Sequence, residues 1–137
     1  MNARTVWEAV VSGGKTALLS SAAGGTVLLL YSFAAGDRVV YLSYAILALA
    51  LLSVFLGGIR GGMVSGAMGW AHGGIVAGCY LLLVLLVKLL VSPAAGFDSN
   101  GIMSALGLLC AGAIGGVMGI NVRFMRRKRI GRRYLDY

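Results

Sequence analysis

Few side chains in this sequence belong to the types that carry out acid–base, nucleophilic or metal chemistry. The chain has one histidine, His72, and two cysteines, Cys79 and Cys110. Its four acidic residues are far apart in the sequence: Glu8, Asp37, Asp98 and Asp136. His72 and Cys79 are two helical turns apart, but a thiolate is strongly disfavoured in apolar surroundings. We find no Ser-His-Asp set, metal-ligand spacing or phosphate-binding loop, and therefore predict no catalytic residue, no metal site, no cofactor and no enzymatic activity.

His72 is the residue best suited to acid–base chemistry. At the cytoplasmic end of a membrane span, its imidazole could sense pH or relay protons. We prefer a structural interpretation, in which it hydrogen-bonds a neighbouring loop or helix end, because no acidic residue falls inside a predicted span to partner it. Arg60 and Asn121 are predicted to lie at the same depth. We therefore predict a small polar cluster of Arg60, His72 and Asn121.

The elements that carry these residues are predicted to be membrane spans. Of 137 residues, 59% are hydrophobic and only 12% are charged, and the mean hydropathy is +0.90. A soluble domain of this length needs more charge to cover its surface. Four apolar stretches are long enough to cross a bilayer as helices: residues 16–35, 39–58, 69–91 and 101–120. We predict an all-α fold, an integral membrane four-helix bundle, with one transmembrane domain over residues 16–121. Both cysteines fall in these spans, where we expect small buried side chains without a disulfide.

Two polar segments flank the predicted domain. Residues 1–15 are mildly amphipathic and either lie at the cytoplasmic membrane surface or extend the first helix. We expect the first span to be an uncleaved helix, because its apolar stretch is longer than the usual core of a secretory signal. Residues 122–137 are predicted to form a basic cytoplasmic tail.

Positive charge is distributed unevenly about the four spans. With both termini on one side, ten of the twelve basic residues fall on that side, and only Arg38 and Lys88 fall on the other. The positive-inside rule therefore predicts cytoplasmic termini in a multi-pass protein of the cell membrane. We expect the basic cluster after the fourth span to contact anionic lipid headgroups and no nucleic acid, because no reading motif or aromatic platform accompanies it. The cluster comprises Arg123, Arg126, Arg127, Lys128, Arg129, Arg132 and Arg133.

Glycines recur at a spacing of four residues, and residues four apart share a helix face. In lipid, such small residues mark helix contacts because they allow close backbone approach. We prefer packing within one bundle over a seam for a second copy or a partner. The predicted packing residues are Gly57, Gly58, Gly61, Gly62, Gly66, Gly69, Gly73, Gly78, Gly107, Gly112, Gly115, Gly116 and Gly119. The rows cross the predicted middle connection, so residues 61–68 could form a loop, a re-entrant segment or an extension of the second helix.

The stretch GGIRGGMVSGAMGWAHGGIVAGCYLLLVLL, which begins at Gly57, resembles the signature of the small four-helix YrzE-like bacterial membrane proteins. The matching positions there are Gly57, Gly58, Gly69, Trp70, His72, Gly73, Gly78 and Tyr80. GAIGGVMGIN, which ends at Asn121, resembles the glycine-rich end of that family's fourth helix. The loop departs from the family by lacking charge in GGMVSGAMG. The resemblance implies four spans in a bacterial inner membrane, and the family is known as uncharacterised.

Two functional hypotheses follow. The first is a non-enzymatic accessory or scaffold subunit that acts through glycine-rich helix contacts, as a homo-oligomer or within a larger membrane complex. The alternative is a homo-oligomeric channel or small-solute transporter, with residues 57–78 lining or gating the path. The alternative is supported by hydroxyl side chains within the spans, although these could bond to their own helix carbonyls. They are Ser20, Ser21, Thr26, Ser43 and Ser53.

Overall fold

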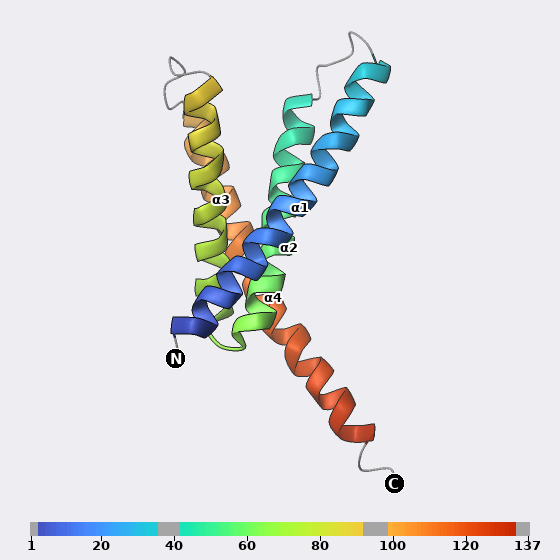
Figure 1. The fold of residues 1–137 in the computed structure, drawn as a ribbon, viewed down its shortest axis with the longest axis vertical. Helices are drawn as coiled ribbons and strands as arrows, with labels where there is room; N and C mark the ends of the chain where they lie inside the picture. The colour runs from blue at the N-terminus through green and yellow to red at the C-terminus, as the bar shows by residue number, and fades with distance from the viewer. Residues whose placement is uncertain (1–2, 36–41, 92–98, 134–137) are drawn as a thin grey trace.

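The chain folds into four long helices, seen in a computed structural model that describes residues 3–35, 42–91 and 99–133. The helices are α1 (Ala3–Ala35), α2 (Leu42–Ser65), α3 (Gly69–Val91) and α4 (Ser99–Arg133). All four are long and apolar enough to cross a membrane. They alternate in direction, so that α1 begins and α4 ends at the same end of the bundle, here called the terminal end (Figure 1). The predicted all-α fold with four membrane-spanning helices is confirmed.

Three helices are longer than the apolar stretches that predicted them. α1 begins at Ala3 rather than at residue 16, and α4 continues to Arg133 rather than ending at residue 120. The first turns of α1 are helical because Ala9, Gly13 and Ala17, four residues apart, form a buried row against the bundle. α3 occupies the predicted range 69–91. The predicted connection at 36–38 lies outside the described residues, as does most of the one at 92–101.

The connection between α2 and α3 is a three-residue turn, which settles the alternatives for residues 61–68. α2 continues through Ser65, and only residues 66–68 are non-helical. Gly66 has a φ of 67°, a left-handed conformation that glycine adopts without a steric penalty at a helix end. Met68 is also left-handed, with a φ of 48°, and its carbonyl accepts the first backbone hydrogen bonds of α3, from the amides of Ala71 and His72. The segment is therefore an extended helix followed by a tight reversal.

The bundle is organised around α2, which forms the two largest helix interfaces, with α1 and with α4, and also packs against α3. The buried core consists of Ala17, Val54, Ala77, Tyr80 and Leu108, with contributions from all four helices. Near the terminal end the helices converge, and toward the other end the pair α1–α2 diverges from the pair α3–α4 (Figure 1). Close packing is therefore concentrated in the terminal half, where the glycine rows lie.

Candidate functional site

The closest helix contacts are made by glycine backbones near the terminal end. The carbonyl oxygens of Gly112 and Gly116 on α4 lie where a Cβ would stand on four glycines of the facing helices: Gly58, Gly62, Gly69 and Gly73. These four belong to α2 and α3, so α4 sits in a groove between the two. Any side chain at these positions would have to displace backbone, which cannot rotate away. The contact therefore holds three helices at a separation that only glycine permits.

Two further glycine contacts extend this core. On α4, Gly115 and Gly119 face the carbonyl oxygens of Phe55 and Ile59 on α2. On α1, a Cβ at Gly13 would stand 2.7 Å from the carbonyl oxygen of Gly57. Gly13 was missed among the predicted packing residues, although its spacing of four from Ala9 and Ala17 was available in the sequence. The glycine core thus joins all four helices.

Not every predicted glycine lies at a contact. A Cβ at Gly78 would meet no atom within 4 Å, so Gly78 does not contribute to packing within this bundle, which is the packing that we preferred for it. At 100° per residue, Gly78 points away from the buried row of Gly73, Val76 and Tyr80 on the same helix. Gly107 has only an ordinary contact, 3.8 Å from Leu51 Cδ2. Spacing by four identified the rows but not which of them face inward.

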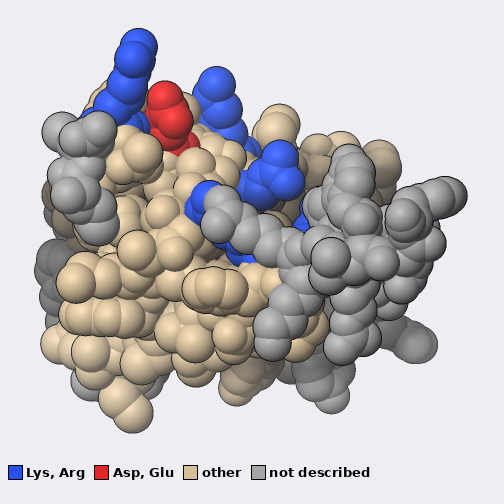
Figure 2. Space-filling view, turned by 90° about the horizontal axis from the view of Figure 1, so that it is seen from below, with Lys and Arg blue, Asp and Glu red and all other residues tan. Residues whose placement is uncertain are grey.

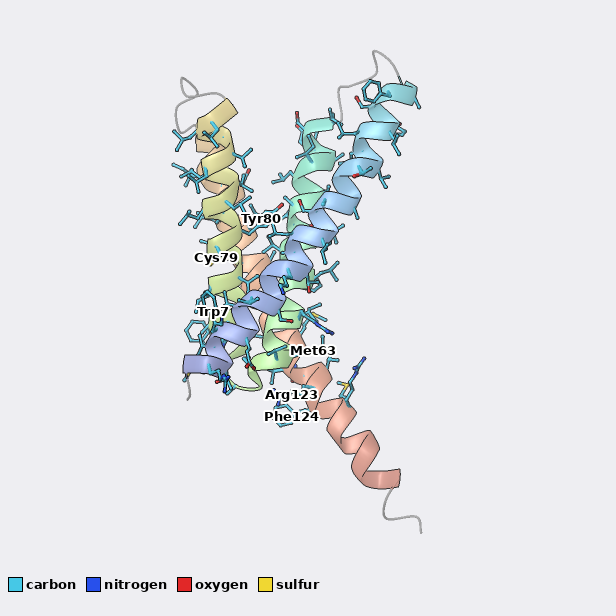
Figure 3. The ribbon with its side chains drawn as sticks, viewed as in Figure 1. Trp7, Met63, Cys79, Tyr80, Arg123 and Phe124 are labelled. Carbon is cyan, nitrogen blue, oxygen red and sulfur yellow. The ribbon has the colours of Figure 1, made fainter. Side chains whose placement is uncertain are left out.

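Arg123 closes the C-terminal end of α2. One terminal nitrogen of its guanidinium donates hydrogen bonds of 3.0 Å to the carbonyls of Met63 and Val64 (Figure 3). The last carbonyls of a helix have no hydrogen-bond partner within the helix and lie at the negative end of its dipole. A guanidinium at this position donates hydrogen bonds to the carbonyls and interacts favourably with the dipole. Gly66 makes room for this contact, because a Cβ on Gly66 would strike the guanidinium. Arg123 therefore ties the α2–α3 turn to α4.

The predicted polar cluster is not joined by hydrogen bonds in the described part of the chain. His72 is buried, and its Nδ1 lies 3.0 Å from the carbonyl oxygen of Met68, which is the structural role that we preferred. Arg60 and Asn121 are exposed, because each points away from the buried face of its helix. Arg123, four residues after the buried Gly119, takes the bridging position. Arg60, His72 and Asn121 were predicted to lie at the same depth in the membrane, but their side chains point in different directions around their helices.

Hydroxyl groups in the spans mostly bond to their own helices. Ser20 donates to the carbonyls of Thr16 and Ala17, and Thr26 donates to that of Ala22. Ser43 is exposed. Ser21 differs, because its Oγ lies 3.0 Å from the hydroxyl of Tyr80 on α3. A hydroxyl pair thus links α1 and α3 at the middle of both helices.

The remaining candidate residues lie on the outside of the bundle. Cys79 and Cys110 are both free and exposed, so the expectation of buried cysteines is wrong. At 100° per residue, each lies away from the glycines that pack within the bundle. Lys and Arg side chains gather at the terminal end of the molecule (Figure 2). Arg126 is one of these exposed side chains, and the basic segment of α4 continues the helix to Arg133. In the described ranges, no group of three or more His, Cys, Asp or Glu side chains could hold a metal ion.

The sequence of the chain is similar to that of a known protein family. No curated protein and no solved structure matches the chain. The model of a family described as "Protein of unknown function (DUF3792)" matches residues 6–119, which include most of the four helices and the whole glycine core. The resemblance to YrzE-like proteins is not tested by this match and stays a prediction. The chain belongs to the DUF3792 family, a family of unknown function.

Proposed function

We propose that this protein is a non-enzymatic accessory or scaffold subunit of a membrane complex, and that it docks through the uncovered face of α3. The observation that carries the proposal is the pair Gly74 and Gly78. A Cβ at either residue would meet no atom within 4 Å, so the chain itself leaves this backbone uncovered. Two glycines four residues apart on one helix face allow a second helix to approach closely in lipid.

The distribution of the other glycines supports this proposal. The inward glycines of α2, α3 and α4 are in contact with backbone of the same bundle, as described above. Gly74 and Gly78 are not needed for that packing, and they are flanked by the exposed side chains of Ile75 and Leu82. A glycine pair bordered by large apolar side chains offers a shallow groove for a helix that itself has small residues on one face. The partner is a transmembrane helix of a second copy or of a larger membrane protein.

The test is the composition and mass of the complex extracted gently from its native membrane. We expect Gly74→Leu combined with Gly78→Leu to reduce recovery of the complex by about tenfold, because the added side chains hold the partner backbone away. Since both sites face open space, the variant monomer should retain its own stability. Gly101→Leu is the matched control, because a Cβ there also meets no atom within 4 Å.

The outcomes separate the two functional hypotheses. A complex that survives in the double variant would contradict docking through α3. A single chain type at a fixed multiple, together with solute flux after reconstitution, would favour the channel or transporter instead. Co-purification of a different membrane protein, lost in the double variant and kept in Gly101→Leu, would support the accessory subunit and identify what it serves.

We also propose that the terminal end faces the cytoplasm and that its basic side chains contact anionic lipid headgroups. The proposal is supported by the excess of Lys and Arg at that end. In a variant with Cys79 and Cys110 replaced by serine, Asp98→Cys should react with a membrane-impermeant maleimide added to intact cells. Asp136→Cys should react only after the membrane is opened. The reverse pattern would contradict this orientation.

A further inference from the structure

The half of the bundle away from the terminal end contains a cavity of about 350 Å³. It lies between α1, from Ser21 to Ser32, α2, from Leu42 to Ala50, and α3, at Tyr80 and Val84. This is the region in which α1–α2 diverges from α3–α4 (Figure 1). Its volume is within the range of pockets that hold small molecules in proteins. All the lining residues lie within the candidate membrane spans, so a ligand would enter from the bilayer.

The wall of this cavity is apolar except at a few hydroxyl groups. Ser21 and Tyr80, which line it, form the hydroxyl pair described above, and Tyr80 projects from the middle of α3 (Figure 3). A pair of hydroxyls has two protons, and the bond between them uses one. No other hydrogen bond is formed by either group among the described residues. One O–H therefore remains able to donate to an acceptor in the cavity.

A third hydroxyl lies at the same level. Gly57 of α2 is in contact with Ala17 of α1 and Val76 of α3. Ser21 and Tyr80 follow Ala17 and Val76 by four residues, about one helical turn, and Ser53 precedes Gly57 by the same number. Because α2 runs in the opposite direction to α1 and α3, these three residues lie on the same side of the contact and at a similar depth in the bundle. Ser53 is only 1% exposed, and its Oγ has no hydrogen-bond partner among the described residues. A buried hydroxyl without a partner is costly, but Ser53 does not line the cavity, so the hydroxyl groups that a ligand would meet at this level are those of Ser21 and Tyr80.

We propose that the cavity binds a neutral, membrane-soluble molecule that places a carbonyl oxygen beside the Ser21–Tyr80 pair. The ligand is neutral because no charged side chain lines the cavity, and an unpaired charge there would be strongly disfavoured. It has an acceptor because the hydroxyl pair has a proton to donate. The rest of the ligand is apolar, to match the leucine, isoleucine and valine side chains of the wall.

The depth of the hydroxyl pair distinguishes this ligand from an ordinary bilayer lipid. Ser21 is fourteen residues before the end of α1 at Ala35, which corresponds to about 20 Å along the helix. The ester carbonyls of a phospholipid remain near the interface, about 15 Å from the bilayer centre. A phospholipid chain inserted into the cavity would present only methylene and methyl groups to the hydroxyls. The polar atom must therefore belong to a molecule that can enter the hydrocarbon entirely.

The test uses the full chain in phosphatidylcholine nanodiscs with benzophenone, a neutral ketone that crosslinks to nearby C–H bonds under light. We expect crosslinks on the lining segments of α1 and α2, and we expect dodecan-2-one to compete at about fivefold lower concentration than n-dodecane. Ser21→Ala combined with Tyr80→Phe should remove this preference for the ketone, because neither hydroxyl is then left to donate to it. Gly25→Leu should fill the cavity and abolish crosslinking there, because Gly25 lines it and a Cβ at that site meets no atom within 4 Å.

Gly14→Leu is the matched control, since Gly14 lies on the same helix, also faces open space and does not line the cavity. Unfolding midpoints of the two glycine variants should equal that of the wild type, so that loss of crosslinking in Gly25→Leu reports the cavity and not the fold. Equal competition by ketone and alkane would overturn the proposal and indicate a groove for acyl chains only. Crosslinks spread evenly over the lipid-facing surface, or unchanged in Gly25→Leu, would overturn it as well.

Discussion

Replacing Gly116 with leucine is expected to separate α4 from the groove between α2 and α3. A Cβ at this position would strike the carbonyl oxygen of Gly69 and would stand 2.7 Å from its carbonyl carbon and 3.1 Å from Gly73 Cα. All three are backbone atoms, so no side-chain rotation can relieve the overlap. Overpacking of this kind costs up to about 3 kcal/mol when side chains can adjust. We expect a larger loss here, which is a substantial part of the stability of an ordinary domain and a clear lowering of the unfolding midpoint.

The measurement is the unfolding midpoint in a titration from mild detergent to dodecyl sulfate, followed by tryptophan fluorescence. Gly101→Leu is the matched control, because it makes the same substitution on the same helix at a position with no atom within 4 Å. Gly116→Ala should lie between the two, since it adds only the Cβ. If Gly116→Leu and Gly101→Leu unfold at the same midpoint, the packing role assigned to the glycine core is wrong.

Replacing Arg123 with alanine is expected to loosen the end of α2 and the turn that follows it. The substitution removes two charge-assisted hydrogen bonds, to the carbonyls of Met63 and Val64, and the cation at the helix dipole. We expect a loss of about 2 kcal/mol, because both carbonyls lose their partner at once. Arg123→Lys should recover part of it, since a lysine keeps the charge but not the planar donor geometry.

Amide hydrogen exchange over residues 62–72 is the most direct readout for Arg123. Faster exchange confined to that segment would locate the effect at the turn. Arg126→Ala is the control, because it removes the same charge three residues further along α4 from an exposed side chain. If both alanine variants exchange alike, the contribution of Arg123 is only its positive charge, and the hydrogen bonds to α2 add nothing measurable.

The helices themselves could be predicted from the sequence because spanning a membrane is a local property. An apolar run of sufficient length must satisfy its backbone hydrogen bonds internally, and a helix does so without reference to the rest of the chain. The same reasoning failed at the ends of the spans. α1 and α4 continue into polar residues because packing and helix propensity, rather than hydropathy, decide where a helix ends outside the hydrocarbon.

The candidate sites were harder to predict, because they depend on the direction of each side chain around its helix. Asn121 and Arg123 are two residues apart and have similar depth, yet Asn121 is exposed and Arg123 reaches α2. The spacing of Arg123 from Gly112, Gly116 and Gly119 would have indicated that it shares their face. Spacing alone, however, did not separate Gly73, which contacts α4, from Gly78, which contacts nothing.

By itself, the sequence determined the number of spans, their approximate limits and the kind of residue that would bring the helices close. These follow from the composition of the chain and the spacing of its apolar and small residues, which can be read from any short segment of the sequence. Only the tertiary structure decided which glycine faces which carbonyl, that Arg123 rather than Asn121 closes α2, and that Ser21 and Tyr80 meet. Those contacts join residues up to 60 positions apart and depend on how the helices are rotated and crossed. Rotation and crossing are set by the closest approach of whole helix faces, which no single segment contains.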